Sequence, residues 1–159
     1  MFRNDGQKRV LIDINQLVRD VLELAQDELL KHHISVEIEL NDELPTAMAD
    51  RVQLQQVILN LITNAIDAME SVTDRPRTLR VKSEIGDRGV SLVSIEDTGT
   101  GIDPDNMNRI FDTYFTTKPS GMGVGLSICR SIVEAHNGRL WASTGAVHGS
   151  VFRLELPTK

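Results

Sequence analysis

The stretch VQLQQVILNLITNAIDAM, residues 52–69, decides the fold because it is a long helix with two unlike faces. Asp50 precedes it as a helix cap, with Gln53 in the capping-box position. At about 100° per residue, one sector collects apolar side chains: Leu54, Val57, Ile58, Leu61, Ile62, Ala65 and Met69. A sector roughly 80° wide collects polar ones: Gln53, Gln56, Asn60, Asn64 and Asp67. The helix is therefore expected to enter a core on one side and to show amides on the other.

The amide face allows two interpretations. Asp67 is the one charged residue of residues 52–69, whereas a surface helix normally carries Lys, Glu and Arg. Asparagine also forms helices poorly, so Asn60 and Asn64 cost stability. The face is either a solvated or internally satisfied polar surface, or a floor of oxygen ligands for a hard cation and of donors for a phosphate.

The whole chain has the size and composition of one compact domain, with 159 residues and a net charge of −6. That negative charge argues against a nucleic-acid partner. A site for an anion would therefore need local positive charge, from a metal ion, a helix N-terminus or a few basic residues. Residues 1–10 lack the apolar centre of a signal peptide, and no apolar run approaches membrane-spanning length. We expect a cytoplasmic domain without direct membrane contact. The single cysteine, Cys129, excludes an internal disulfide and a thiolate zinc cluster.

Apolar periodicity and capping residues predict two further long helices. One is expected over residues 14–29, after a cap at Asp13, and it ends at His32 and His33. The other is expected over residues 123–136, with Cys129 on its apolar side and an αL cap at Asn137-Gly138. A short helix is expected within residues 105–110.

Alternating or β-branched runs predict five strands. They are expected over residues 34–40, 79–85, 90–96, 139–144 and 150–156, with a turn at residues 86–89. Three helices and five strands predict an α+β fold, a two-layer α/β sandwich in which a mixed five-stranded sheet packs on the helices. Residues 1–10 are expected to be a disordered leader or linker remnant, and residues 11–159 to form the domain.

Two glycine-rich loops follow the amide helix. Residues 97–101, Asp-Thr-Gly-Thr-Gly, come directly after a strand, where glycines let the backbone approach a flat ligand and Asp97 could accept from an exocyclic amino group. Residues 121–125, Gly-Met-Gly-Val-Gly, precede a helix, which presents free N–H groups and a positive dipole end to a polyphosphate. Taken alone, residues 97–101 could be a plain turn, and residues 121–125 could owe their glycines to a close packing partner.

The segment between the two loops, residues 111–120, reads FDTYFTTKPS. Phe111 and Phe115 are suited to anchor a mobile flap whose Thr116, Thr117 and Lys118 face phosphates. The alternative is an ordinary surface loop with two buried aromatic side chains. The amide helix, the acidic turn, the flap and the glycine loop follow one another in this order along the chain. Together, in this order, they are far more specific for a nucleotide site than any one of them alone.

In this order the sequence resembles the GHKL ATPase superfamily, and most closely the sensor histidine kinases. Residues 59–68 resemble the N box, residues 97–102 the G1 box, residues 110–115 the F box and residues 121–127 the G2 box, and residues 149–157 are similar to the family's last strand. The resemblance implies a Bergerat fold with a flexible ATP lid. Among the sensor histidine kinases, the sequence is most similar to the nitrogen-regulatory or oxygen-sensing type.

The resemblance also implies a site for ATP and Mg²⁺. Asn64 would coordinate the magnesium, Asn60 would contact phosphate or metal, Asp97 would accept from the adenine amino group, and Asn60 and Lys118 would act in catalysis. The implied nucleotide-binding residues are Asn60, Asn64, Asp67, Asp97, Gly99, Gly101, Ile102, Phe115, Thr116, Thr117, Lys118, Gly121, Met122, Gly123, Val124, Gly125, Leu126 and Ser150.

Asn60 separates two branches of this superfamily. Members that hydrolyse ATP carry a glutamate general base there, and an amide is a poor base, so the γ-phosphate would survive for transfer. The acceptor would be a histidine on a separate dimerisation domain, with a response regulator downstream, because His32 and His33 lack the helix-centred His-Glu context of a phosphoacceptor. His136, at a helix end, suits capping or packing, and His148 lies in a turn.

Two other functions stay open on the sequence. One is an ATP-hydrolysing machine of the gyrase or chaperone branch, which Asn60 argues against. The other is a nucleotide-binding regulatory module such as an anti-sigma serine kinase. The isolated domain is expected to be a monomer.

Overall fold

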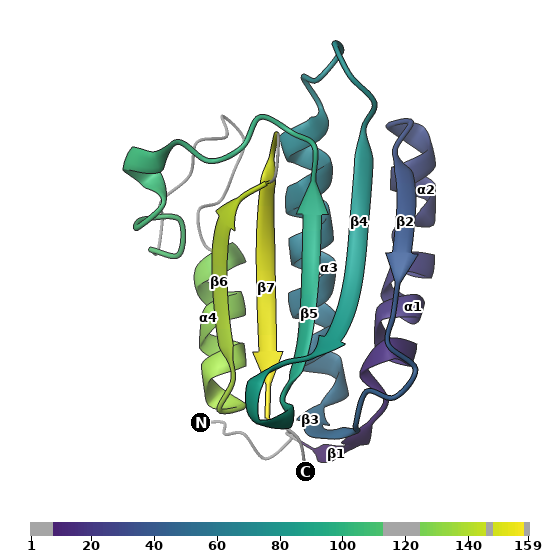
Figure 1. Ribbon diagram of the computed structural model, residues 1–159, viewed down its shortest axis with the longest axis vertical. Coiled ribbons are helices and arrows are strands. Elements are labelled where there is room, and N and C mark those ends of the chain that lie inside the picture. The colour runs from purple at the N-terminus through teal and green to yellow at the C-terminus, as the bar shows by residue number, and fades with distance from the viewer. Residues whose placement is uncertain (1–7, 113–124, 146–147, 158–159) are drawn as a thin grey trace.

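A mixed five-stranded sheet forms one layer of the computed structural model, which describes residues 8–112, 125–145 and 148–157. The strands lie in the order β2-β4-β5-β7-β6 (Figure 1). They are β2 (Ser35–Glu39), β4 (Thr78–Ile85), β5 (Ser91–Asp97), β6 (Arg139–Thr144) and β7 (Ser150–Leu156). β2 and β4 run parallel, and the other neighbours are antiparallel. The expected mixed sheet is confirmed, strand by strand.

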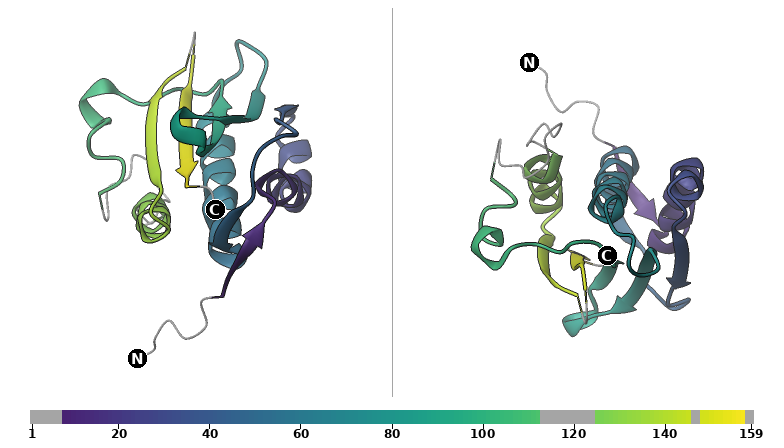
Figure 2. Two further views of the ribbon diagram at one scale, coloured as in Figure 1. Left: turned by 60° about the horizontal axis from the view of Figure 1, so that its bottom comes forward. Right: turned by 90° about the horizontal axis from the view of Figure 1, so that it is seen from above.

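Four helices cover one face of this sheet (Figure 2). They are α1 (Ile14–Leu24), α2 (Gln26–Lys31), α3 (Arg51–Met69) and α4 (Gly125–Ala135). The single helix expected over residues 14–29 is wrong, because the chain breaks at Ala25 (φ −90°, ψ 0°). Apolar spacing gave no sign of this break, since Leu22, Ala25 and Leu29 are all buried. The two-layer sandwich itself is confirmed.

A two-stranded antiparallel ribbon, β1 (Arg9–Ile12) with β3 (Ala47–Asp50), was not expected. It lies at the end of the molecule where α3 begins (Figure 1). The strands escape sequence patterns because each has four residues and β3 is alanine-rich, which is poor strand composition. Arg9 and Val10 therefore belong to the fold, although residues 1–10 were expected to be a leader.

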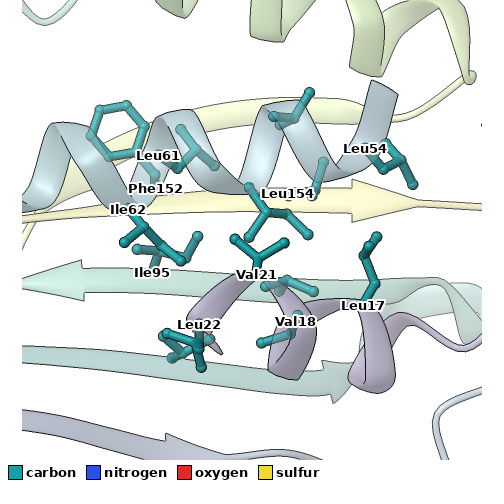
Figure 3. Close-up of a cluster of buried hydrophobic side chains, with 14 of the residues drawn as sticks. Leu17, Val18, Val21, Leu22, Leu54, Leu61, Ile62, Ile95, Phe152 and Leu154 are labelled. Atoms are coloured by element: carbon teal, nitrogen blue, oxygen red, sulfur yellow. The ribbon is translucent and has the colours of Figure 1, made fainter. Parts of the chain in front are cut away.

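The core lies between the sheet and the helices α1 and α3 (Figure 3). Figure 3 shows that α1 and α3 contribute side chains to one cluster with Leu154 of β7. These side chains are Leu17 and Val21 of α1 and Leu54 and Leu61 of α3. Burying each such side chain contributes about 1.5–3 kcal/mol. Every residue expected on the apolar side of α3 is buried, so the predicted two-faced helix is confirmed. Asp13 and Asp50 cap α1 and α3 by accepting from the N–H groups of Gln16 and Gln53.

The remaining local predictions differ from the structure at their edges. The short helix expected within residues 105–110 is a single 3-10 turn, Pro104–Asn106, because Asp103 caps the N–H of Asp105 and the chain then turns. The described part of α4 is Gly125–Ala135, and the expected beginning at residue 123 lies outside the described residues. The αL cap at Asn137 is confirmed, with a φ of 62°. Within the described residues, no helix is both long and apolar enough to cross a membrane.

Candidate functional site

A buried carboxylate marks the end of β5. Asp97 is 1% exposed, and its two oxygens have separate partners. The Gly99 N–H donates to Oδ1 at 2.8 Å, and the Ser150 hydroxyl donates to Oδ2 at 3.1 Å. Glu96 pairs with Val151 across β5 and β7, which brings Ser150 beside Asp97. Burial raises the pKa of Asp97, while these hydrogen bonds act in the opposite direction and favour the ionised form.

The backbone after Asp97 packs closely on its neighbours at the glycine positions; we call residues 97–101 the Asp97 loop. The Thr100 N–H donates to the Ala68 carbonyl of α3 at 3.1 Å, and a Cβ added at Gly99 would overlap that carbonyl. Gly101 has a φ of +82°, in the left-handed region that favours glycine. The glycines at residues 97–101 thus allow close packing on α3 and β7, and the expected approach to a flat ligand stays a prediction.

Gly149 completes this packing. Its φ is +77°, and a Cβ there would overlap the carbonyl oxygen of Asp97. Sequence reasoning used Gly149 only as the beginning of a strand. Its proximity to Ser150 was the available signal, but the overlap depends on how β7 sits against β5.

Two arginines of the α3–β4 connection were missed by sequence reasoning. Arg75 donates through Nε to the Thr98 carbonyl at 2.9 Å and through Nη2 to the Gly99 carbonyl at 2.7 Å. Arg77 donates to three other carbonyls, those of His32, Glu70 and Val72. No motif signals such contacts, because the acceptors are backbone groups brought near only by the fold.

The amide face of α3 lies next to α4. Asn60 and Asn64 are half-buried one turn apart, and Asp67 is exposed. The Asn60 Nδ2 donates to the Cys129 sulfur at 3.6 Å, and Cys129 is fully buried. Burial raises the pKa of the Cys129 thiol, so it is a packing and acceptor group rather than a nucleophile. The face thus supplies amide oxygens suited to a hard cation.

Of the residues expected to form the site, those at the end of β5 and the beginning of β7 lie at one end of the molecule, whereas Asn60 lies in the middle of α3 beside Cys129 of α4. Figure 1 shows α3 and β5 ending at the same end, where β7 begins. The described site residues are Asn60, Asn64, Asp67, Asp97, Gly99, Gly101, Ile102, Gly125, Leu126 and Ser150. Lying outside the described residues are Phe115, Thr116, Thr117, Lys118, Gly121, Met122, Gly123 and Val124, and with them the expected mobile flap.

Phe111, at the beginning of that expected flap, is anchored on the core. Its ring packs edge-to-face on Phe152 of β7, with centroids 6.2 Å apart and planes at 79°. The Arg130 guanidinium lies 5.1 Å from the same ring, within cation–π range. Phe111 therefore packs on the core, as both interpretations of residues 111–120 expect, and the flap itself lies outside the described residues.

Two histidines, His136 and His32, have partners within the fold. His136 is buried, its Nδ1–H donates to the Ile132 carbonyl at 2.9 Å, and its Nε2 accepts from the Asp50 N–H at 3.0 Å. Both ring nitrogens are used in packing the end of α4 against the start of α3, at the opposite end of the molecule from the end of β5 (Figure 1). At the end of α2, the Nε2 atom of His32 lies 3.5 Å from the Oε1 atom of Glu28. The expected structural role of His136 is confirmed.

A separate cavity of about 240 Å³ adjoins the Asp97 loop. Its lining consists of Arg75, Gly99, Thr100, Gly101, Ile102, Thr144, Gly145, His148 and Gly149. Neither the Asp97 carboxylate nor the amides of α3 lines it. The cavity therefore gives the Arg75 side of the loop access to solvent.

Comparison with known proteins identifies relatives along nearly the whole chain. Residues 49–159 match the family of histidine kinase-, DNA gyrase B- and HSP90-like ATPases. The chain is 36% identical over 146 residues to the sensor protein TdiS of Thauera aromatica, covering 91% of this chain and 27% of TdiS. It is 39% identical over 155 residues to the sensor protein FixL of Bradyrhizobium diazoefficiens, covering 98% of this chain and 30% of FixL. The chain thus spans less than a third of either relative.

Solved structures show the same fold. The catalytic domain of histidine kinase ThkA superposes with a TM-score of 0.83 and 34% identity, covering 95% of this chain and 96% of that domain. Full-length ShkA in complex with AMPPNP gives 0.82 and 29% identity, over 94% of this chain and 31% of ShkA. ThkA in complex with the response regulator TrrA gives 0.79 and 31% identity, over 95% of this chain and 42% of that chain.

Proposed function

Because the chain belongs to the family of histidine kinase-, DNA gyrase B- and HSP90-like ATPases, we propose that it binds ATP with Mg²⁺ and donates the γ-phosphoryl group to a histidine. The histidine belongs to a separate dimerisation domain, and a response regulator acts downstream, within two-component signalling. The observation that carries this proposal is the buried Asp97 carboxylate, oriented by Gly99 and Ser150 at the end of the amide face. The domain works in the cytoplasm, where ATP is supplied.

Asp97 would select the base. An ionised carboxylate accepts a hydrogen bond from the exocyclic amino group of adenine, whereas guanine presents a carbonyl oxygen there and would be repelled. The Gly99 N–H and the Ser150 hydroxyl occupy one lone pair on each oxygen and leave acceptor capacity for the base. The closely packed glycine backbone at Gly101 would let the ring lie against the loop.

Asn64 and Asn60 would hold the magnesium ion. Their half-buried amides fit a hard cation, which prefers oxygen ligands and keeps several waters and phosphate oxygens around it. The ion would neutralise charge on the phosphates. Residues 121–125 would present backbone N–H groups to the phosphates at the beginning of α4, with Lys118 as a further cation.

Asn60 favours transfer over hydrolysis. Its Nδ2 is engaged with Cys129, and an amide cannot take a proton from water at neutral pH, so the site lacks a general base at this position. The acceptor imidazole supplies its own lone pair. A P–N bond forms as the bond between the γ-phosphorus and the bridging oxygen breaks, and ADP leaves while the imidazole loses its proton to solvent.

The decisive experiment mixes the domain, γ-labelled ATP and Mg²⁺ with separately produced histidine-bearing dimerisation domains of related sensor kinases. We expect label on the histidine, and none with the Asp97→Asn variant. Rapid phosphate release by the domain alone would instead favour the gyrase or chaperone branch. Label on a serine of a partner would favour the serine kinase. Absence of transfer across several acceptor domains would contradict the proposal.

A further inference from the structure

Arg75 and Arg77 flank Pro76 in the connection between α3 and β4, and each side chain binds backbone carbonyls. Their acceptors differ in location. Arg77 joins the end of α3 to the end of α2 through Glu70, Val72 and His32. Arg75 binds only the Asp97 loop through its Nε and Nη2 groups, and its Nη1 pairs with Asp74. Two chemically similar side chains therefore support different parts of the molecule.

The peptide group between Thr98 and Gly99 connects Arg75 to Asp97. Its carbonyl accepts from Arg75 Nε at 2.9 Å, and its N–H donates to Asp97 Oδ1 at 2.8 Å. A peptide group is planar and trans, so its C=O and N–H point in opposite directions. Holding the carbonyl therefore aims the N–H at the carboxylate.

The next peptide group, between Gly99 and Thr100, is held in the same manner. Its carbonyl accepts from Arg75 Nη2 at 2.7 Å, and its N–H donates to the Ala68 carbonyl at 3.1 Å. The planar guanidinium presents two donors in a fixed fork, which matches two successive carbonyls. Glycine at position 99 offers no steric restraint of its own, so these hydrogen bonds fix the loop.

We propose that Arg75 is a positioning residue for base recognition: through two successive peptide groups it holds the Asp97 carboxylate in the orientation that prefers adenine over guanine. This inference rests on the proposed function, since it assumes that the Asp97 loop receives a purine base. Arg75 is 21% exposed and touches no nucleotide in this scheme, and it acts through the Thr98 and Gly99 peptides. Without the two Arg75 hydrogen bonds the Asp97 loop would be free to rotate, and the preference for adenine over guanine would fall.

The test compares Arg75→Met and Arg75→Lys with the matched control Arg77→Met. Calorimetric titrations with Mg²⁺ and non-hydrolysable ATP and GTP analogues give the ratio of the two affinities. Since hydrogen bonds from a charged donor are lost, we expect Arg75→Met to lower the ATP-over-GTP preference about tenfold. Arg75→Lys recovers only part of it, because an ammonium lacks the fork. Arg77→Met lowers thermal stability but keeps the preference.

Amide NMR gives a second measurement without nucleotide. The Gly99 N–H resonance should shift in both Arg75 variants and stay unchanged in Arg77→Met, because Arg75, unlike Arg77, donates to the carbonyl of that peptide. If wild type fails to bind the ATP analogue, the proposed function itself is wrong. If wild type binds and discriminates, and a folded Arg75 variant keeps both the preference and the Gly99 resonance, the role assigned to Arg75 is overturned. Arg75→Lys keeps the charge and the stem, so it supplies the folded variant if Arg75→Met unfolds.

Discussion

At the scale of single residues, Asp97 carries a conflict between stability and function. Burial disfavours its ionised form and raises its pKa above the ordinary value of 3.8, yet the ionised form is the better acceptor for an amino group. Gly99 and Ser150 reduce this conflict by donating to the two oxygens. A functional carboxylate of this kind is expected to destabilise the empty protein.

Replacing Asp97 by asparagine tests that conflict through the pH dependence of stability. Because the native pKa of Asp97 is raised, its favourable contribution is fully present below about pH 3.8, the unfolded value, and is lost as pH rises through the native pKa. In the variant the amide oxygen would accept from the Gly99 N–H and the amide nitrogen would donate to the Ser150 hydroxyl, without ionising. Urea unfolding from about pH 4 to about pH 8 should therefore show Asp97→Asn gaining stability relative to wild type as pH rises. A widening loss in the variant would contradict the assignment.

Sequence predicted some of these residues and missed others for a physical reason. Asp97 and Asn64 stand in recognisable patterns, a strand end followed by glycines and an amide-lined helix. Arg75 and Gly149 work through backbone groups that are distant along the chain, namely the Thr98 carbonyl and the Asp97 carbonyl. Such contacts depend on the final packing of loops, which no local pattern encodes.

At the scale of elements, Gly149 in the turn between β6 and β7 can be compared with Gly89 in the turn between β4 and β5. Gly149 and Gly89 have φ values of +77° and +78°, but a Cβ at Gly149 would overlap Asp97, whereas a Cβ at Gly89 meets nothing within 4 Å. We expect Gly89→Ala to cost about 1 kcal/mol in free energy of unfolding from backbone strain alone. Gly149→Ala should cost at least about 3 kcal/mol, or prevent folding. Equal losses in chemical denaturation would contradict this packing.

Helix α3 permits a test of the amide face. Asn64→Ala should lower the affinity for a Mg²⁺–nucleotide complex about tenfold or more, because an oxygen ligand is lost. Gln56→Ala, on the same face but two turns earlier and exposed, is the control and should bind as wild type does. Calorimetry with and without Mg²⁺ separates the effects. If Asn64→Ala retains the Mg²⁺ dependence of wild type, Asn64 is not a ligand of the cation.

Sequence patterns identified the long elements better than the short ones. α3 and the five main strands carry clear periodicity and capping residues, and the structure has them within a residue or so. β1 and β3 have only four residues each and β3 is alanine-rich, so neither leaves a pattern, and the break at Ala25 keeps the apolar spacing intact. These features follow from tertiary packing rather than from local preference.

At the scale of the whole molecule, α4 is held at its C-terminal end by residues that are distant along the chain. Its beginning adjoins the glycine-rich loop, and its end is tied to the β1–β3 ribbon, where Arg9 donates to the Ala135 carbonyl at 2.8 Å and His136 accepts from the Asp50 N–H. Figure 2 shows α3 between α1 and α4 on one face of the sheet. The contacts at the end of α4 therefore also hold α4 beside the amide face of α3.

His136 should therefore contribute to global stability. His136→Leu leaves the buried Asp50 N–H without its acceptor, which should cost about 1–3 kcal/mol in free energy of unfolding. His33→Asn is the control, because His33 is exposed and asparagine tolerates its φ of 57°. Urea denaturation of both variants measures the difference. A His136→Leu variant as stable as wild type would show that the tie is unimportant.

Nucleotide binding between the Asp97 loop and the amide face of α3 underlies every functional conclusion above, and calorimetry measures it without any partner domain. A non-hydrolysable ATP analogue is titrated, with Mg²⁺, into wild type and into Asp97→Asn. We expect one nucleotide bound per wild-type domain and strongly weakened binding in a variant that remains folded. Absence of binding to wild type, or equal affinity in the folded variant, would show that Asp97 does not receive the base.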